Sequence, residues 1–211
     1  MMSFMARIEA VLFDLGNVLA FHDNALLFRR FAEAAHLSQD EAAQRLDPAL
    51  WQQVNLGALG GEALRGELNR RLGTALSPAA FFALWNCHFT VNAEVLPFVE
   101  ALVGRVKLLL LSNTNALHFE FLKARLPVLE RFDHLLVSHE LHLAKPDPAI
   151  FRAALATAGT APEATAYFDD YPEYVEAARR LGIRAELFRQ TSDFPAQLRS
   201  LGLGSESLQG R

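Results

Sequence analysis

Short apolar runs alternate with longer amphipathic segments over the second half of the chain. Five runs are rich in branched and aromatic residues and have the length of buried strands: IEAVLF at 8–13, VKLLLL at 106–111, HLLVS at 134–138, ATAYFDD at 164–170 and RAELF at 184–188. Segments with apolar residues at helical spacing separate the later runs. The alternation predicts an α/β fold in which a doubly wound parallel sheet is covered by helices on both faces.

The interval between the first two apolar runs is too long for this alternation of strands and helices. Residues 14–105 separate them, whereas an ordinary strand–helix–strand crossover takes about 30 residues. Ser38 and Glu41 form a capping-box pattern there, and helical spacing recurs at 24–37, 37–46, 60–73 and 77–89. We therefore expect a helical-bundle cap domain at 20–92, inserted into a core domain formed by 1–19 and 93–211.

Composition narrows the range of partners. The 211 residues carry a net charge of −4 without a block of basic residues, so nucleic acid is not expected as a partner. The sequence has no apolar run of about 18 residues and no charged-then-apolar leader, so neither a membrane span nor export is expected. Cys87 is the only cysteine, which excludes an internal disulfide and favours a cytoplasmic location. We expect Cys87 to be a small core residue.

Polar residues stand where several of the predicted strands end. Asp14 follows the first run, Ser112 follows the second, and Asp169 and Asp170 end the fourth. Lys145 follows the third run through a short loop. Each residue alone has an ordinary interpretation, as a helix cap, a strand end or a solvated charge. Together they indicate a ligand site, because the carboxyl ends of parallel strands meet at one edge of the sheet.

These residue types suit phosphoryl transfer. Asp14 can act as a nucleophile through an aspartyl-phosphate, and Asp14 with Asp170 can hold Mg²⁺, which favours one or two carboxylates. The Ser112 hydroxyl and the Asn113 amide can donate hydrogen bonds to the phosphoryl group. Lys145, a compact point charge, can neutralise both the phosphate and the nucleophile.

Four segments resemble, in chain order, motifs one to four of the haloacid dehalogenase (HAD) superfamily: VLFDLGNVL, LLLLSNTN, LAKPDPAIF and AYFDDYPEYVEAARRLGI. The resemblance covers essentially the whole chain, and the helical insertion resembles that superfamily's cap of the first type. The motifs FDLGN and LSNTN are most similar to those of alpha-D-glucose-1-phosphate phosphatase-like members.

The resemblance implies an Mg²⁺-dependent phosphatase that hydrolyses a small phosphorylated metabolite, such as a sugar phosphate, through an aspartyl-phosphate. It also implies a role for each matching residue: nucleophile and metal ligand for Asp14, a metal-binding backbone carbonyl for Gly16, phosphate binding for Ser112 and Asn113, the motif-three lysine for Lys145, and a metal ligand for Asp170, supported by Asp169.

Two positions depart from the superfamily's pattern. Most of its phosphatases have an aspartate, acting as general acid and base, where this chain has Gly16, and an asparagine where it has Tyr174. The missing acid predicts a preference for phosphates with good leaving groups, with a loss of about 10²–10⁴ in rate for poor ones. His22, which follows the first strand into the cap, is a candidate substitute. We expect His118 to lie on a helix surface.

Two other functions stay open. A 2-haloacid dehalogenase would share the fold and attack carbon with Asp14, but such enzymes need no metal and lack the adjacent acids Asp169 and Asp170. A non-catalytic phospho-ligand-binding protein would have little use for so many acids near a phosphate. In the cap, Trp51 and Trp85 are expected to be core residues rather than a platform for the substrate.

Overall fold

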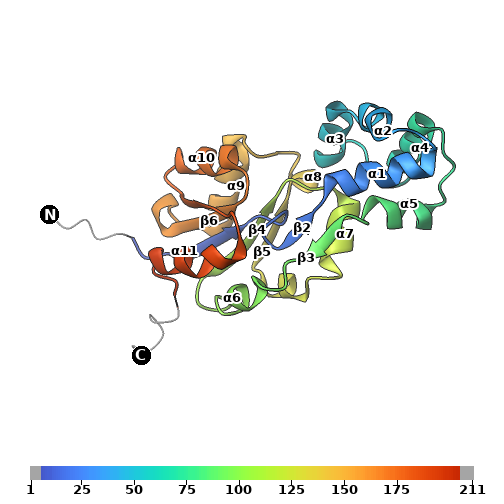
Figure 1. Cartoon of the computed structure of the whole chain (residues 1–211). Coiled ribbons are helices and arrows are strands. Elements are labelled where there is room, and N and C mark those ends of the chain that lie inside the picture. The colour runs from blue at the N-terminus through green and yellow to red at the C-terminus, as the bar shows by residue number, and fades with distance from the viewer. Residues whose placement is uncertain (1–5, 205–211) are drawn as a thin grey trace.

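The computed structural model describes residues 6–204, and its centre is a parallel sheet of five strands (Figure 1). The strands lie in the order β5-β4-β1-β6-β7, with bounds β1 (Ala10–Phe13), β4 (Lys107–Ser112), β5 (His134–Val137), β6 (Thr165–Asp169) and β7 (Arg184–Leu187). The five predicted apolar runs form these five strands. The α/β prediction is therefore confirmed. The chain runs outward from β1 through β4 to β5 and then crosses to the other side of β1, where it forms β6 and β7.

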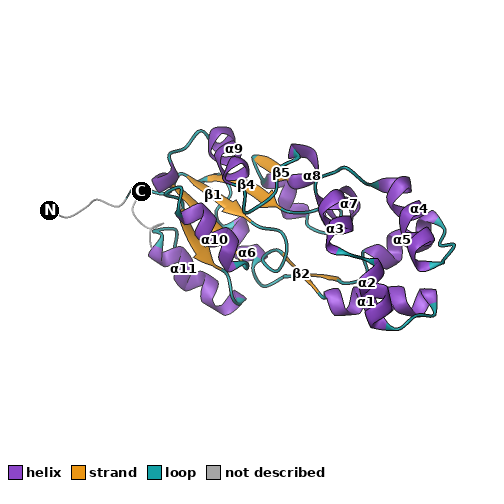
Figure 2. Cartoon of the chain, turned by 90° about the horizontal axis from the view of Figure 1, so that it is seen from above, coloured by secondary structure: helices purple, strands orange, loops and turns teal. Residues whose placement is uncertain are grey.

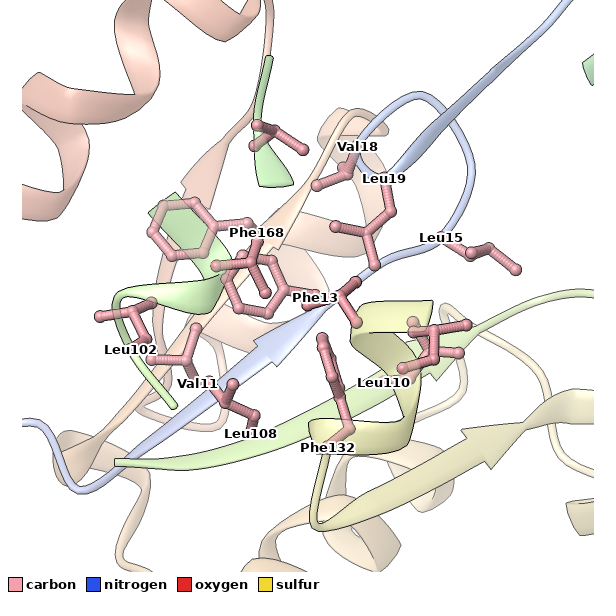
Figure 3. Close-up of a cluster of buried hydrophobic side chains, with 14 of the residues drawn as sticks. Val11, Phe13, Leu15, Val18, Leu19, Leu102, Leu108, Leu110, Phe132 and Phe168 are labelled. Atoms are coloured by element: carbon pink, nitrogen blue, oxygen red, sulfur yellow. The ribbon is translucent and has the colours of Figure 1, made fainter. Parts of the chain in front are cut away.

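Alternate residues of the central strands face opposite layers of helices. Val11 and Phe13 of β1 point into one apolar cluster, whereas Leu12 points into another. The first cluster, drawn in Figure 3, is closed by α6 (Leu96–Glu100), α7 (Ala116–Lys123) and α11 (Phe194–Ser200). The second is closed by α9 (Pro148–Ala158) and α10 (Pro172–Arg179). Both faces of β1 are thus buried, as its continuous apolar run predicts.

Five of the six helices between β1 and β4 form a separate layer at one end of the molecule (Figures 1 and 2). They pack around a third apolar cluster that includes Phe31, Leu64 and Trp85. The capping box of Ser38 and Glu41 is confirmed at the second helix. The bounds are α1 (Asn24–Ala35), α2 (Gln39–Arg45), α3 (Pro48–Asn55), α4 (Gly61–Leu72) and α5 (Pro78–Trp85). The sequence analysis missed α3, although Asp47 followed by proline is a typical helix start.

A two-stranded antiparallel ribbon joins the cap helices to the core. It consists of β2 (Ala20–His22) and β3 (Phe89–Val91), and His22 lies opposite Phe89. The sequence analysis did not predict these strands, because three residues are too few to show a period. The domain boundaries at 20 and 92 stay a prediction. The remaining short elements are α8 (Ser138–Leu141), η1 (Pro127–Arg131), η2 (Pro162–Ala164) and η3 (Thr191–Asp193).

One expectation about the cap is wrong. Cys87 is exposed, since it follows the last turn of α5 on the side away from the cap core. Within residues 6–204, no helix combines the length and the apolar character that a bilayer crossing requires.

Candidate active site

Three of the predicted site residues lie at the carboxyl edge of the sheet because of strand register. Phe13 of β1 pairs with Leu110 of β4 and Phe168 of β6. Asp14 therefore follows β1 at the level where Asp169 ends β6, and its backbone N–H donates to the Phe168 carbonyl at 2.9 Å. Ser112 ends β4 at the same edge. The common edge that the sequence predicts is present.

Lys145 connects two of the carboxylates. Its Nζ lies 2.8 Å from Oδ1 of Asp14 and 2.6 Å from Oδ2 of Asp169. The Lys145 side chain is buried, so its charge is compensated almost entirely by these two acids. Burial alone would lower the pKa of Lys145, but the charges of Asp14 and Asp169 outweigh burial and the pKa lies above its ordinary value. The lysine is therefore a fixed cation beside the nucleophile candidate.

The side chain of Asn113 holds the lysine segment rather than pointing its amide freely into the site. Its Oδ1 accepts from the Lys145 backbone N–H at 2.8 Å, and its Nδ2 donates to the Lys145 carbonyl at 2.8 Å. The Tyr174 hydroxyl lies 3.4 Å from the same Nδ2. A phosphate contact from Asn113 is thus left to its backbone N–H. The Ser112 hydroxyl has no hydrogen-bond partner within the described part of the chain and faces the same cavity.

The acids that could hold a metal ion are Asp14, Asp169 and Asp170, whose carboxylate oxygens lie within 4.8 Å of one another. Asp169 is already saturated, because Lys145 and the Tyr167 hydroxyl donate to Oδ2 and the Tyr171 N–H donates to Oδ1. Its geometry suits the supporting role that the resemblance implies, rather than direct ligation.

Asp14 and Asp170 keep free coordination capacity. Lys145 occupies only Oδ1 of Asp14, and Asn17 donates to only Oδ2 of Asp170, at 2.8 Å. Within residues 6–204, the Gly16 carbonyl accepts no backbone hydrogen bond. Two carboxylates and one carbonyl are oxygen ligands of the kind that Mg²⁺ takes together with water and phosphate. The residues present therefore fit the ion.

The pKa of Asp14 reflects this crowding of charge. The pKa of Asp14 is raised to about 7: burial is the largest cause, the charges of Asp169 and Asp170 also raise the pKa, and Lys145 opposes the rise. Asp14 therefore needs positive charge nearby to be fully ionised at neutral pH. A cation shared with Asp170 would supply that charge.

A cavity of about 530 Å³ opens in front of these groups, between the sheet edge and the cap. Among residues 6–204, Asp14, Lys145 and Asp170 are the only charged side chains that line it. The half toward the cap is lined by neutral aromatic, amide and imidazole side chains: Phe28, Trp51, Asn55, His88, Phe89 and His118. Trp51 packs on the cap core, stacked on Trp85 at 5.0 Å, and also faces the cavity. Trp85 itself is buried core, as expected.

The two histidines of this wall are uncharged. Burial lowers the pKa of His88 to about 4 and that of His118 well below its usual value. The expectation of a surface position for His118 is wrong: the side chain is buried, with Nδ1 bonded to Asn115 and Nε2 near the Trp85 carbonyl. The reason is that α7 turns this face toward α5 of the cap, a contact that the sequence of α7 alone does not show.

Residues 8–182 match the family described as haloacid dehalogenase-like hydrolase. The chain belongs to this family. It is an enzyme of the hydrolase class, and the superfamily resemblance read from its four motifs is confirmed.

Several relatives of this HAD-like hydrolase are known. Over 186 residues it is 26% identical to the D-ribitol-5-phosphate phosphatase of Bacteroides thetaiotaomicron, covering 83% of this chain and 89% of that protein. It is 26% identical over 208 residues to a drimenol cyclase of Aspergillus calidoustus, covering 96% of this chain but only 38% of that protein. A HAD family enzyme from Bacteroides thetaiotaomicron, solved with magnesium and inorganic phosphate, superposes with a TM-score of 0.78 at 26% identity, over 86% of this chain and 94% of that chain.

The HAD-like cap and core touch near the far wall of the cavity. The Ser138 hydroxyl donates to the Asn55 carbonyl of the cap at 2.5 Å and accepts from the Thr114 backbone N–H of the core at 3.0 Å. Gly57, at φ +75°, lies so close to His139 that a Cβ there would come 2.2 Å from its carbonyl oxygen. The cap turn that begins at Leu56 therefore packs directly against the core beside the site.

The sequence analysis missed several residues that shape the site. Asn17 contacts Asp170, Tyr167 donates to Asp169, and Trp51 lines the cavity. Asn17 had a signal, because a Gly-Asn pair after a strand is typical of a turn; the φ of Asn17 is 52°, in the left-handed region that asparagine tolerates better than most residues. Tyr167 and Trp51 had none, since their roles depend on which neighbouring element lies opposite.

Proposed function

We propose that this HAD-like hydrolase is an Mg²⁺-dependent phosphatase that hydrolyses a small phosphorylated metabolite through an aspartyl-phosphate on Asp14. The observation that carries the proposal is the arrangement of Asp14, Lys145 and Asp170 around one cavity, with a free Ser112 hydroxyl at its edge. The names of the relatives support it, since one is a phosphatase of a sugar-alcohol phosphate and another was solved with magnesium and phosphate.

Each residue has a defined task in this reaction. A carboxylate oxygen of Asp14 attacks phosphorus, and the bond between phosphorus and the leaving oxygen breaks. Lys145 and the Ser112 hydroxyl stabilise the negative charge on the phosphoryl oxygens. Asp14, Asp170 and the Gly16 carbonyl would hold Mg²⁺, which when bound supplies positive charge for the phosphoryl oxygens. Water then attacks the phosphorus of the aspartyl-phosphate and restores the carboxylate.

The cavity favours leaving groups without charge. Its cap half has no charged side chain, so a second phosphate, a carboxylate or an ammonium group would be desolvated there without a partner. Trp51 and Phe89 offer flat apolar faces, and the Nδ1 of the buried His88 has no hydrogen-bond partner within residues 6–204. A polyol, sugar or aryl group could pack on these aromatic faces.

A panel of phosphate esters, assayed for phosphate release with Mg²⁺, tests the proposal. We expect sugar, polyol and aryl monophosphates to be hydrolysed with higher kcat/KM than phosphoserine or a sugar bisphosphate. Asp14→Asn, which keeps the shape of the side chain but not the nucleophile, should lose more than about 10³ in rate while retaining its fold.

Three results would contradict the proposed function or the proposed substrate class. Binding of the same esters without turnover would support the non-catalytic alternative. Halide release from a 2-haloacid, independent of Mg²⁺, would support the dehalogenase. A preference for anionic leaving groups would refute the substrate class and leave the phosphatase activity standing.

A further inference from the structure

Asn17 lies between a candidate metal ligand and the strand that leads into the cap. Its Nδ2 donates to Oδ2 of Asp170 at 2.8 Å, and its Oδ1 accepts from the His22 backbone N–H at 3.2 Å. The same Nδ2 lies 3.2 Å from Nε2 of His22. Because an amide nitrogen can only donate, Nε2 is the acceptor of this second bond. The amide is thus held at both ends, and its donation to Asp170 has a fixed direction.

Each carboxylate that is expected to hold Mg²⁺ has one oxygen bonded by the protein and one oxygen left open. In Asp14, Lys145 donates to Oδ1 at 2.8 Å, and no hydrogen bond reaches Oδ2 within residues 6–204. In Asp170, Asn17 donates to Oδ2, and no hydrogen bond from the same part of the chain reaches Oδ1. An ion on a bonded oxygen would face the positive end of an N–H group. Each acid therefore offers one oxygen to an ion.

One oxygen from each acid is the coordination that suits Mg²⁺. This ion requires near-octahedral geometry, keeps several waters and binds through one or two carboxylates, whereas Ca²⁺ takes about six to eight oxygens and accepts both oxygens of one carboxylate. Oδ1 of Asp14 is held by a buried cation, but Oδ2 of Asp170 is held only by a neutral amide. Without that amide, Asp170 could present both of its oxygens to a larger ion.

We propose that Asn17 is a positioning residue that limits Asp170 to one metal-facing oxygen and thereby makes the site select Mg²⁺ over Ca²⁺. The inference rests on the proposed function, because it concerns the Mg²⁺ site of that function. His22 acts only through Asn17, since its ring nitrogen and its backbone N–H both bond to the amide. With this nitrogen engaged, His22 is a poor candidate for the acid–base role that Gly16 cannot fill.

Urea unfolding at increasing concentrations of MgCl₂ or CaCl₂, at constant ionic strength, tests the proposal. An ion that binds only the folded protein stabilises it, so the series gives a dissociation constant for each ion. The quantity compared between variants is the ratio of the Ca²⁺ constant to the Mg²⁺ constant. The unfolding curve without either ion shows whether a variant folds, and no measurement depends on turnover.

Asn17→Gly removes the amide and keeps the backbone, because glycine freely adopts the φ of 52° at this position. Mg²⁺ binding should weaken by about 10–100-fold, the usual effect of losing a hydrogen-bond partner of a metal ligand. Ca²⁺ binding should weaken much less, because Asp170 gains a second oxygen for this ion, so the ratio should fall at least about tenfold.

His22→Phe keeps a flat ring and removes the acceptor nitrogen. The ratio should fall by about 2–10-fold in this variant, the effect of one lost hydrogen bond. In the Asn17→Gly background the same substitution should have no further effect, because the amide through which His22 acts is gone. Asn24→Gly is the matched control, since Asn24 lines the same cavity but its exposed side chain bonds to no carboxylate within the described residues. Its ratio should equal that of the wild type.

An unchanged ratio in Asn17→Gly would overturn the proposal, whether both ions bind as before or both bind equally more weakly, because a merely structural role affects the two ions alike. A further effect of His22→Phe in the Asn17→Gly background would remove His22 from it. Both results leave the phosphatase function standing, since phosphate release is measured separately. If neither ion stabilises the wild type, the proposal and the Mg²⁺ site of the proposed function fail together.

Discussion

Lys145 offers the sharpest test of the electrostatics of the site. Replacing it with methionine removes the only cation in contact with Asp14 in the described structure and leaves Asp169 without its ion-pair partner. Lys145 is the charge that opposes the rise of the Asp14 pKa, so the pKa should rise above about 7 in the variant. Each further unit lowers the ionised fraction of the nucleophile tenfold at neutral pH.

Two losses then add up in kcat/KM. The nucleophile is less ionised, and the phosphoryl oxygens lose a fixed positive charge in the transition state. Breaking a buried ion pair by removing one partner costs about 3–5 kcal/mol. If half of this cost appears in turnover, kcat/KM falls by about 10–70-fold.

The stability of the variant should depend on pH in a defined direction. A carboxyl whose folded pKa lies above its unfolded value binds more protons in the folded state, so stability falls as pH rises from about 4 through the folded pKa. Lys145→Met should therefore lose more stability at pH 8 than at pH 5. Urea unfolding at both pH values, with phosphate release in Mg²⁺ as the activity assay, measures the two effects.

Lys145→Arg separates charge from shape. The Lys145 ammonium is enclosed by both acids and lies 5.1 Å and 5.7 Å from the ring centroids of Tyr174 and Tyr167. A planar guanidinium is bulkier and should lose most activity despite its charge. Lys123 is exposed near the end of α7, so Lys123→Met and Lys123→Arg are matched controls. Near-normal kcat/KM in Lys145→Arg, or more than a tenth of it in Lys145→Met, would refute the reasoning.

Three further outcomes follow from the site. EDTA should abolish phosphate release and Mg²⁺ should restore it, and full activity in chelator would exclude the metal site at Asp14 and Asp170. Trp51→Ala should raise KM by about 5–30-fold, the equivalent of about 1–2 kcal/mol of lost aromatic contact, with a smaller change in kcat; an unchanged KM would remove Trp51 from the substrate site. Because His88 has a folded pKa of about 4, against about 6.5 when unfolded, this residue alone should contribute a loss of about 2 kcal/mol of stability between pH 7 and pH 5, which the raised pKa of Asp14 opposes. The change in unfolding free energy between these pH values, measured with urea, should therefore differ by about 2 kcal/mol between His88→Gln and the wild type, and an equal change in both proteins would contradict the burial argument.

The parts of the fold that depend on local pattern could be predicted from the sequence. The five apolar runs became the five strands, and the polar residues at their ends met at one edge, because parallel strands in register place their carboxyl ends together. Asp14 and Lys145 were found in this way. Their ion pair joins residues 131 positions apart, and only the register of β1 against its neighbours decides that the two side chains meet.

What could not be predicted depends on contacts between elements. The Asn113 side chain looks like a phosphate ligand in the sequence, but the fold brings the Lys145 backbone within reach of both ends of its amide, and the amide holds that segment instead. His118 looks exposed on its own helix, but α5 covers it. In both cases the sequence gives the chemistry of the side chain, and the neighbour that satisfies it comes from a distant segment.

The pairing of Asn17 with His22 lies between these two cases. The residues are close in sequence, yet their contact requires the tight turn in which Asn17 adopts a left-handed conformation and Ala20 bonds back to Leu15. This turn starts β2, the strand through which the chain enters the cap. The core alone would determine the position of a side chain on the loop after β1. His22 instead lies on β2, which pairs with β3, the strand that follows the cap helices in the chain. The position of the His22 ring is therefore coupled to the segment that carries the cap, although Asp14 and Lys145 belong entirely to the core.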